Sequence, residues 1–550
     1  MTHSSKCDRP IGLSLDLARR FARALAACAL CIGFTSTVVI AQDQGADRRF
    51  DASSVDANLA ADPLAIEAPD GTPQITHWDF DPAFAAHGWG IDRFSDSSAK
   101  NYYGRKIARL DNGDIVIAGL VPRAGSSTSD QLGLVRYTAA GRRIAWASVD
   151  PTWSRYSSQY IVYPNGAANQ PSGAFVSVVG LQEYAGNLFV MVNEQSADGA
   201  VHPIVMVFAE SGFFRGWWTY VPGGSNQKPG TGFTISSSKL IVLGADPSPS
   251  DSGRPQMWMS RYSIAANGSL SADQDFGSQG IATYRASACT VVASSTYCDT
   301  YPAAIAPTGG LTQLVSPKFY VIASVRGPGH IDFSTATMRF NGNGSRDTTF
   351  NYSTSSGYDG SFDFDDGGDN ADIAVAIRTT YHLVVPVQVV EDIYVVSKVS
   401  RTIQAGIGVV RMDGSGQLVS GFGNGGKVLT GGCGDGSGNC QFSNVEDVPF
   451  SMTLSKGYLG IAGWFQGFDG TVHRFTEPMF AAVNAGNGTV ENIYNYPIQI
   501  GDAAFYDVVG NGDGTFTLAG DAREIANGNN VAYLTARLQP HDFIFRNGVD

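Results

Sequence analysis

The chain has 550 residues, of which 43% are hydrophobic and 16% are charged, and it contains 65 glycines. This composition is sufficient for a large buried core, and abundant glycine with few charges favours short strands and tight turns over helical bundles. The formal net charge is −13. Because an acidic surface repels phosphate backbones, we expect no nucleic-acid partner.

Residues 1–41 are predicted to be a signal peptide. Arginines at 19, 20 and 23 precede an apolar stretch, and Val39-Ile40-Ala41 offers a cleavage site before Gln42. The flanks of Arg19-Arg20 fit a twin-arginine signal poorly, and the apolar stretch is at the short limit for a membrane anchor. We therefore expect a secreted or periplasmic protein that is monomeric and has no transmembrane segment after cleavage. Without these 41 residues, which hold five basic and two acidic residues, the formal charge is −16.

Residues 42–75 are rich in Asp, Ala, Ser and Pro without periodicity, which is typical of a flexible leader. The remaining chain, 76–550, contains four cysteines in two local pairs, Cys289 with Cys298 and Cys433 with Cys440. The pairs occupy equivalent places in two repeats, which predicts two short disulfide-closed loops in an oxidising compartment. Zinc binding is the alternative, but no histidine flanks either pair and the spacings are wider than C-x₂₋₄-C.

One sequence unit, clearest at Gly408–Thr430, recurs after residue 75. It consists of an apolar run ending in arginine, a glycine-centred turn, and a second run containing Phe-Gly. Clear copies occupy 134–144, 259–280 and 338–350, and weaker copies occupy 206–214, 482–490 and 534–543. The position of the arginine is held in the seven copies by Arg136, Val207, Arg261, Arg339, Arg411, Val483 and Arg537.

Each unit is predicted to hold four antiparallel strands. An apolar second strand such as DIVIAG (114–119) or TFTLAG (515–520) has no helical period and is bounded by Gly, Asn and Asp, which indicates a strand buried on both faces. Seventeen residues separate Gly119 from Arg136, and the same interval separates Gly520 from Arg537. Seven units of four strands predict an all-β fold, a seven-bladed β-propeller; a solenoid is the structural alternative.

The seventh unit lacks its outer Phe-Gly strand, because only QPHDFIFRNGVD follows the Arg537 strand. The segment 78–94 resembles the missing part and has no first half of its own. We therefore expect this N-terminal strand to pair beside 531–538 and close the ring, which avoids two open sheet edges.

The unit is similar to the delta-60 repeat of bacterial secreted proteins. The resemblance rests on Asn112–Gly119 followed by Arg136-Tyr137, on Arg261-Tyr262 with 276–280, and on Arg411 with 422–426. It covers about 78–545 and implies a secreted propeller-like array. The family has no established activity, so the resemblance implies no catalytic residues.

Two groups of residues could carry chemistry. The repeated arginine is predicted to brace neighbouring backbone carbonyls with its fixed donors, although it could instead bind a ligand. Hard oxygen ligands in a glycine-containing loop suit Ca²⁺, although the EF-hand spacing is absent and a solvated acidic loop is the alternative. The candidate metal ligands in this loop are Asp363, Asp365, Asp366, Asp369 and Asp372.

No G-x-S-x-G or H-E-x-x-H motif occurs, and Trp217-Trp218 could stack a sugar or simply lie on a strand with one exposed face. The leading hypothesis is a secreted, non-catalytic β-propeller that serves as a binding scaffold for a protein or glycan. The alternative is a propeller enzyme, a Ca²⁺-assisted hydrolase or lyase. Under both hypotheses, we expect the ligand or substrate site on the face with the long connections, such as 245–254, 286–312 and 362–372. Variable loops on a rigid scaffold commonly form binding sites.

Overall fold

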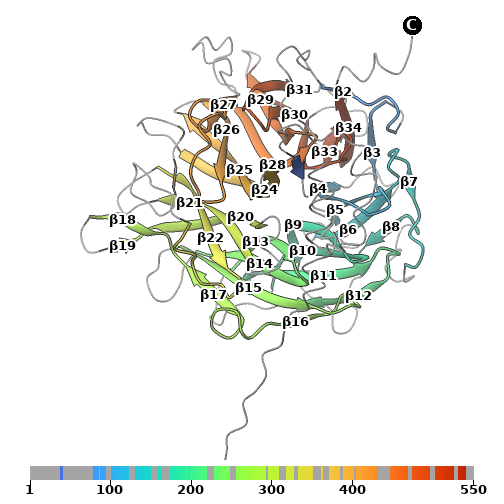
Figure 1. The fold of residues 1–550 in the computed structure, drawn as a ribbon. Helices are drawn as coiled ribbons and strands as arrows, with labels where there is room; N and C mark the ends of the chain where they lie inside the picture. The colour runs from blue at the N-terminus through green and yellow to red at the C-terminus, as the bar shows by residue number, and fades with distance from the viewer. Residues whose placement is uncertain are drawn as a thin grey trace, which may run out of the picture.

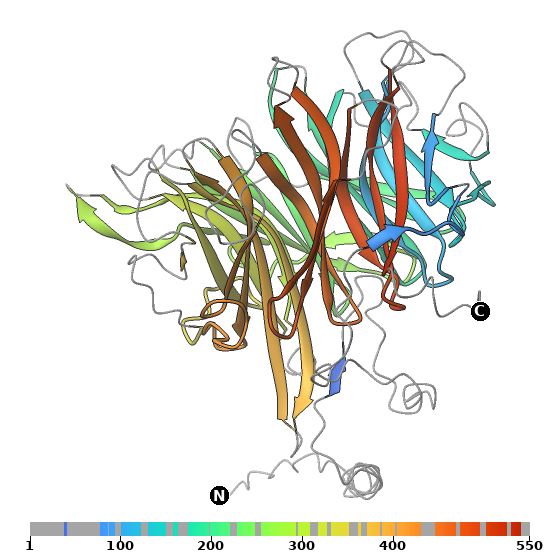
Figure 2. The ribbon, with the colours of Figure 1, turned by 90° about the horizontal axis from the view of Figure 1, so that it is seen from above.

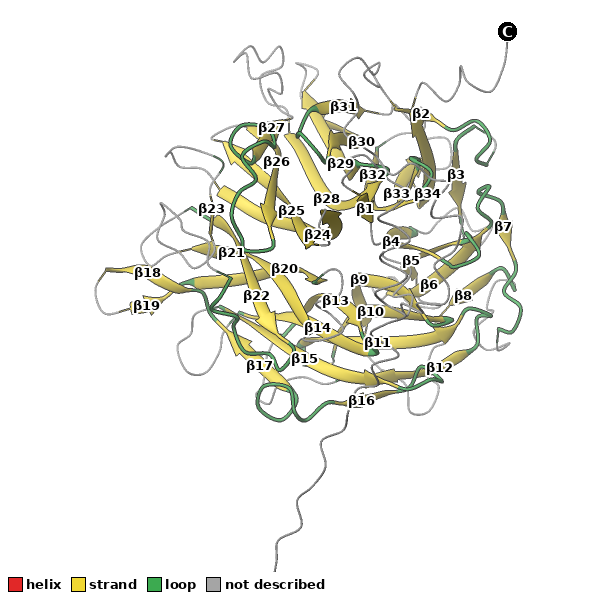
Figure 3. Ribbon diagram, viewed as in Figure 1, coloured by secondary structure: helices red, strands yellow, loops and turns green. Residues whose placement is uncertain are grey.

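The structure is a computed structural model, and it is built from strands. It describes residues 38–40, 78–85, 87–93, 101–122, 130–149, 158–162, 174–196, 198–219, 228–247, 255–292, 295–308, 317–326, 332–350, 361–362, 364, 371–384, 388–401, 404–430, 446–468, 474–495, 502–524 and 530–540. These residues form strands, turns and loops without a helix (Figure 3). Within them, no helix is present that is long and apolar enough to cross a membrane.

The strands follow one another as antiparallel hairpins, each set beginning with an innermost strand. The first set consists of β4 (Tyr103–Arg109), β5 (Ile115–Pro122) and β6 (Asp130–Tyr137), with β7 (Arg143–Ile144) and β8 (Tyr160–Val162) outside. The second consists of β9 (Ala174–Tyr184), β10 (Asn187–Gln195), β11 (Val201–Ala209) and β12 (Phe214–Trp218). The third consists of β13 (Gly230–Ser236), β14 (Lys239–Asp246), β15 (Gln256–Ile264), β16 (Leu270–Ala272) and β17 (Ile281–Tyr284).

The next three sets repeat the same order. One holds β20 (Asp299–Pro307), β21 (Lys318–Arg326), β22 (Ser334–Asn341) and β23 (Ser361–Phe362), and it follows a separate hairpin of β18 (Ser287–Val292) and β19 (Ser295–Tyr297). The next holds β24 (Ala371–Val384), β25 (Gln388–Arg401), β26 (Gln404–Asp413) and β27 (Lys427–Thr430). Then come β28 (Glu446–Ser455), β29 (Tyr458–Phe468), β30 (Arg474–Asn484) and β31 (Val490–Asn495).

The last set combines the two ends of the chain. Its strands β32 (Ala503–Gly510), β33 (Phe516–Glu524) and β34 (Asn530–Pro540) are joined by β2 (Trp78–Phe80) and β3 (Trp89–Asp92), which pair antiparallel with β34. Trp78 is fully buried and lies against the rings of Tyr458, Phe480 and Phe516. The pairing is the one predicted for the N-terminal half-unit. The number of blades and the closure of the whole ring stay predictions.

The sets follow one another around a common centre, with the first strand of each set nearest to it (Figure 1). The cores lie between neighbouring sheets: Leu120 and Leu134 of the first set pack in one cluster with Met206 and Phe208 of the second. Burial on both faces explains the near-continuous apolar runs of the second strands.

The β24–β25 hairpin is longer than the others and extends beyond the sheets (gold in Figure 2). The short strand β1 (Val38–Ile40) pairs with β24 at this extension. Because β1 lies inside the predicted signal peptide, it belongs to the uncleaved chain.

One predicted long connection is wrong. The interval 286–312 contains β18, β19 and the innermost strand β20. The sequence pattern did not indicate this strand, because it contains Pro302 and Pro307 and proline cannot donate to a sheet ladder. An innermost strand is a sheet edge, and Pro302 lies next to a β-bulge, so proline is tolerated there.

Candidate functional site

A β-bulge interrupts the innermost strand of every set at an equivalent place. One residue is left out of register with the second strand, and bulges of this kind redirect a side chain. In each case the bulged residue is half-buried. The seven bulged residues are Arg105, Val179, Thr231, Ala303, Val375, Phe450 and Tyr506.

The bulge explains the glycine that ends the predicted second-strand motif. Gly119, Gly463 and Gly520 each lie opposite a bulge. A Cβ at any of them would lie closer than 3.0 Å to a carbonyl oxygen of the innermost strand. The motif therefore reflects close approach of two backbones, which only glycine permits.

Three successive innermost strands place their bulged side chains in contact. The rings of Phe450 on β28 and Tyr506 on β32 have centroids 4.9 Å apart. The guanidinium carbon of Arg105 on β4 lies 3.9 Å from the centre of the Tyr506 ring and 5.1 Å from that of Tyr103. Asp521 on β33 completes this group, and we call Tyr103, Arg105, Phe450, Tyr506 and Asp521 the inner-strand cluster.

Arg105 and Asp521 form an ion pair within the cluster. Nη1 of Arg105 donates a hydrogen bond of 2.7 Å to Oδ2 of Asp521, and the two side chains are 26% and 11% exposed. Burial raises the pKa of Asp521 to about 6, with Arg105 and then Arg523 opposing the shift. Burial also raises the pKa of Tyr506, the charge of Asp521 adds to that shift, and Arg105 opposes it. The carboxyl of Asp521 therefore titrates close to neutral pH.

A second carboxylate fixes the strands that carry the cluster. Asp507, next to Tyr506, accepts a hydrogen bond of 2.5 Å from Ser451 of the preceding sheet and one of 3.1 Å from the Ile107 backbone N–H of the following sheet. Asp507 is buried. Asp507 thus links three innermost strands, at the position next to the bulged residue Tyr506.

The cluster lies where innermost strands begin and second strands end. Tyr103 and Arg105 stand near the start of β4, Tyr506 in the first half of β32, and Asp521 in the second half of β33. The connections between second and third strands leave from this end. This is the face on which we expected a ligand site.

Of the predicted calcium ligands, Asp363, Asp365, Asp366 and Asp369 lie outside the described residues. Asp372 is buried at the start of β24, where its carboxylate accepts a hydrogen bond of 2.9 Å from the Phe364 backbone N–H. Asp502, just before β32, accepts one of 3.2 Å from the Thr476 backbone N–H. In the described part of the chain, no three His, Cys, Asp or Glu side chains are grouped so that they could hold a metal ion.

The repeated arginine braces backbone carbonyls, as predicted, and the structure shows that these carbonyls belong to the next sheet. Nε of Arg411 donates to Asp392 at 3.0 Å, while Nη1 donates at 2.6 Å to the Gly486 carbonyl in the turn of the following sheet. Arg339 does the same with Asp347 and the Gly414 carbonyl. Arg136, Arg261 and Arg537 likewise pair with Asp114, Asp273 and Asp81 and donate to the carbonyls of Glu210, Gly342 and Ala139.

Cys298 is fully buried and is bonded in a disulfide. Cys289 lies on β18, which pairs with β19 just before Cys298, but its side chain is outside the described set. Cys433 and Cys440 lie outside the described residues altogether. The two disulfide pairings stay predictions.

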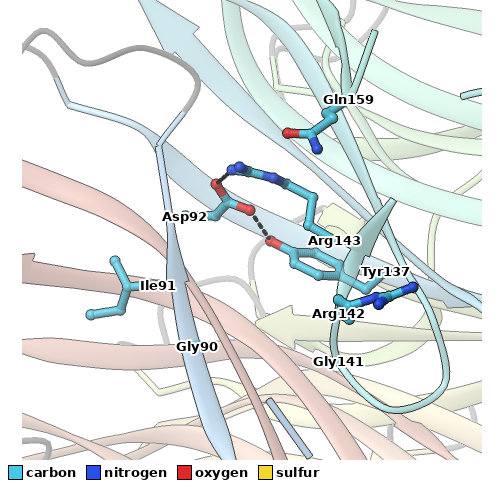
Figure 4. Close-up of a pocket in the computed structure, with 8 residues that line it drawn as sticks. All are labelled: Gly90, Ile91, Asp92, Tyr137, Gly141, Arg142, Arg143 and Gln159. Atoms are coloured by element: carbon cyan, nitrogen blue, oxygen red, sulfur yellow. Dashed lines mark hydrogen bonds and ion pairs between the residues drawn. The ribbon is translucent and has the colours of Figure 1, made fainter. Parts of the chain in front are cut away.

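A pocket of about 390 Å³ lies at the outer rim, between β3 and the first sheet (Figure 4). Its buried floor is Asp92, which accepts hydrogen bonds from the hydroxyls of Tyr137 at 3.1 Å and Tyr160 at 2.8 Å. Arg143 donates to the same carboxylate at 2.5 Å. Burial raises the pKa of Asp92, and Arg143 and the two tyrosines oppose the shift. Because four strands meet on one carboxylate, this network ties the N-terminal half-unit to the first sheet.

Trp217 and Trp218 lie on the outer strand β12. Trp217 packs against the core between the first and second sheets, and Trp218 packs against the core between the second and third. Both side chains are therefore partly buried, each against a different core.

No protein-family model matches the chain, and a comparison with curated proteins gives no match. The resemblance to the delta-60 repeat therefore has no support from a family model. Solved structures do match in fold. A polysaccharide lyase, Uly1, is 10% identical, with 92% of this chain and 98% of that chain covered and a TM-score of 0.41.

The periplasmic gluconolactonase PpgL of Pseudomonas aeruginosa is 11% identical over 71% of this chain and 84% of its own, with a TM-score of 0.38. A protein of unknown function from Dyadobacter fermentans is 10% identical over 71% of this chain and 97% of its own, with a TM-score of 0.34. Identities and scores at this level say nothing about ligand or reaction, so the site must be argued from its own residues.

Proposed function

We propose that the protein is a secreted or periplasmic β-propeller scaffold of delta-60-type units that binds a glycan at the inner-strand cluster without turning it over. The observation that carries this proposal is the row Phe450–Tyr506–Arg105. Aromatic rings provide flat apolar surface, and the guanidinium provides directional donors beside it. Half-buried aromatic rings with a few fixed polar groups are the usual composition of a binding site.

The cluster is rigid, which favours binding. Its three bulged residues come from β28, β32 and β4, and Asp507 bonds those strands to one another. A site whose side chains are already in place loses little conformational entropy when a ligand arrives.

A second candidate is an acid–base enzyme at the same place. It is favoured by Asp521, whose pKa is raised to about 6 by burial. A carboxyl group that titrates near neutral pH can donate or accept a proton in catalysis. Most glycoside hydrolases need two carboxylates, whereas among the described residues Asp521 is the one carboxylate in the cluster.

The two candidates differ in product formation. A panel of neutral and acidic oligosaccharides is incubated with the full-length exported protein, bound sugar is measured by calorimetry, and products are sought by mass spectrometry. We expect binding without product, and loss of binding in Tyr506→Ala. Tyr301→Ala is the control, because Tyr301 is also a half-buried tyrosine on an innermost strand, but its ring packs against Phe333 and lies outside the cluster.

Product formation that disappears in Asp521→Asn would replace the scaffold with the enzyme. Binding that survives Tyr506→Ala unchanged would remove the cluster as the site.

We also propose that the acidic side chains within 363–372 form a Ca²⁺ site. The proposal rests on their oxygen ligands and close spacing alone. Calorimetric titration of Ca²⁺ into the wild type and an Asp365→Asn, Asp366→Asn variant tests it, and equal heats for both would end it.

A further inference from the structure

Arg105 has donor capacity that the fold does not use. A guanidinium carries five N–H donors in a planar fork. Nη1 of Arg105 binds Asp521, and among the described residues Asp521 is the one carboxylate in ion-pair contact with it. The side chain as a whole is 26% exposed, and its contacts with Asp521 and Tyr506 engage fewer than five donors.

The orientation of that fork is fixed. Arg105 is held over the rings of Tyr506 and Tyr103 and by the Asp521 carboxylate. Cation–π contacts and a charged hydrogen bond together restrict a long side chain that would otherwise move freely. A fixed, planar, partly exposed guanidinium is suited to a planar two-oxygen acceptor.

We propose that the ligand bound at the inner-strand cluster is a carboxylate-bearing sugar, with its carboxylate held by Arg105 and its ring against Phe450 and Tyr506. This inference rests on the proposed function and narrows it to one class of glycan. The bulged residues of the other four sheets carry neither a charge nor an aromatic ring, so among the bulged residues these features are confined to Arg105, Phe450 and Tyr506: the other four are Val179, Thr231, Ala303 and Val375.

Charge limits the size of such a ligand. The chain without its signal peptide has a formal charge of −16, so a long polyanion is repelled as a whole. A mono- or disaccharide with one or two carboxylates meets mainly the local charges of Arg105 and Asp521, because salt screens charges beyond about 8 Å at physiological ionic strength.

Asp521 competes with the ligand for Arg105. The charged and titratable groups around Asp521 are Arg105 and Tyr103 on β4, Tyr506 on β32, Arg523 beside it on β33, and Tyr533 on β34. Protonation of Asp521 below about pH 6 leaves the Arg105 charge uncompensated, whereas a sugar carboxylate stays ionised down to about pH 4. Affinity for the acidic sugar is therefore expected to rise as the pH falls from 7.5 to 5.

The test uses calorimetry on the full-length exported protein with digalacturonic acid and with its methyl ester, at pH 7.5 and pH 5. We expect the acid to bind and the ester to bind at least about tenfold more weakly, since a hydrogen-bonded charge is absent from the ester. Arg105→Gln should abolish the difference between the two sugars. Asp521→Asn should strengthen binding of the acid at pH 7.5 and flatten its pH dependence, an effect that loss of structure cannot produce.

Arg215→Gln is the control, because Arg215 is an exposed arginine on the outer strand β12. If the acid and the ester bind equally well and Tyr506→Ala abolishes the binding of both, the carboxylate inference is overturned, but the proposed glycan-binding scaffold is supported. Acid binding that is unchanged in both Arg105→Gln and Asp521→Asn overturns the assignment to this cluster. Absence of binding for both sugars overturns the inference as well, and the wider oligosaccharide panel then decides whether the scaffold binds any glycan.

Discussion

Arg537, near the end of the chain, donates a hydrogen bond of 2.7 Å from Nη1 to the carbonyl of Ala139 in the first sheet. Nε of the same side chain donates at 2.6 Å to Asp81 in the N-terminal half-unit. One arginine thus contacts the turn of the first sheet, the N-terminal segment and, through its own strand, the last sheet. The arginine that joins neighbouring sheets elsewhere also joins the two ends of the chain.

Deleting 76–96 should destroy the fold. The deletion removes β2 and β3, exposes the unpaired edge of β34, and removes Trp78 and Phe84, both fully buried. An unpaired strand edge next to an apolar surface promotes aggregation. Size-exclusion chromatography and thermal unfolding should show aggregated or unfolded protein. Deleting 43–75 is the control and should leave the thermal midpoint unchanged, whereas a monomeric 76–96 deletion with the wild-type midpoint would refute the pairing as a source of stability.

Removing the arginine of an internal unit should be costly. Arg411→Ala removes the guanidinium that binds Asp392, which is 3% exposed, and the hydrogen bond that Nη1 donates to the Gly486 carbonyl. Breaking a buried ion pair by removing one partner costs about 3–5 kcal/mol. Urea unfolding should report a loss of this size, and the further change Asp392→Asn should recover part of it. Arg215→Ala should alter the unfolding free energy by less than about 0.5 kcal/mol, as surface changes do. If Arg411→Ala lowers the unfolding free energy no more than Arg215→Ala does, the arginine does not brace the sheets.

The sequence predicts the parts of this molecule that repeat. The arginine recurs at one position of the unit, and three of the five arginines, Arg136, Arg261 and Arg537, follow a second-strand glycine at the same interval of seventeen residues. Each arginine meets the equivalent backbone turn of the next sheet. The partner of the 78–94 segment could be predicted for a related reason: the last unit lacks a strand that every other clear unit possesses. In a repeated unit, a local sequence pattern also predicts how one unit contacts the next.

The inner-strand cluster could not be predicted in the same way. Arg105, Phe450 and Tyr506 share no chemistry, and only a one-residue slip between two strands makes them equivalent. The available signal was indirect, namely the glycine of the second strand that faces each of these bulges. The network at Asp92 left no signal, since Asp92 and Tyr160 are 68 residues apart and belong to no repeated motif.

The second-strand glycine should tolerate no side chain. A Cβ at Gly520 would overlap the Ala504 carbonyl of the adjacent innermost strand, and neither backbone can move without breaking the ladder. Gly520→Ala should destabilise the protein by about 1–3 kcal/mol or more, as overpacking does. Gly232→Ala is the control, since a Cβ there meets nothing within 4 Å. Thermal and urea unfolding should separate the two variants clearly, and equal stability would mean that the glycine has another role.

Stability should fall in acid through Asp347. Burial is the largest single influence on its pKa and raises it, but hydrogen bonds from Lys318, Thr349 and Arg339 together hold the pKa well below the usual range. A carboxyl whose pKa is lower in the folded state than in the unfolded chain stabilises the fold above the unfolded value, about pH 3.9, and loses that contribution as the pH falls further. Unfolding free energies measured from pH 7 to pH 2 should therefore decline below about pH 4.

Asp347→Asn isolates this contribution. The variant should be less stable than the wild type at pH 7, and the difference should shrink as the pH approaches 2, because Asp347 is then protonated in the unfolded wild-type chain and this favours unfolding. Asp513→Asn is the matched control: Asp513 also accepts hydrogen bonds from a neighbouring threonine, but it is exposed and pairs with no cation in the described residues. A difference between Asp347→Asn and wild type that stays constant from pH 7 to pH 2 would show that the ionised Asp347 does not stabilise the fold.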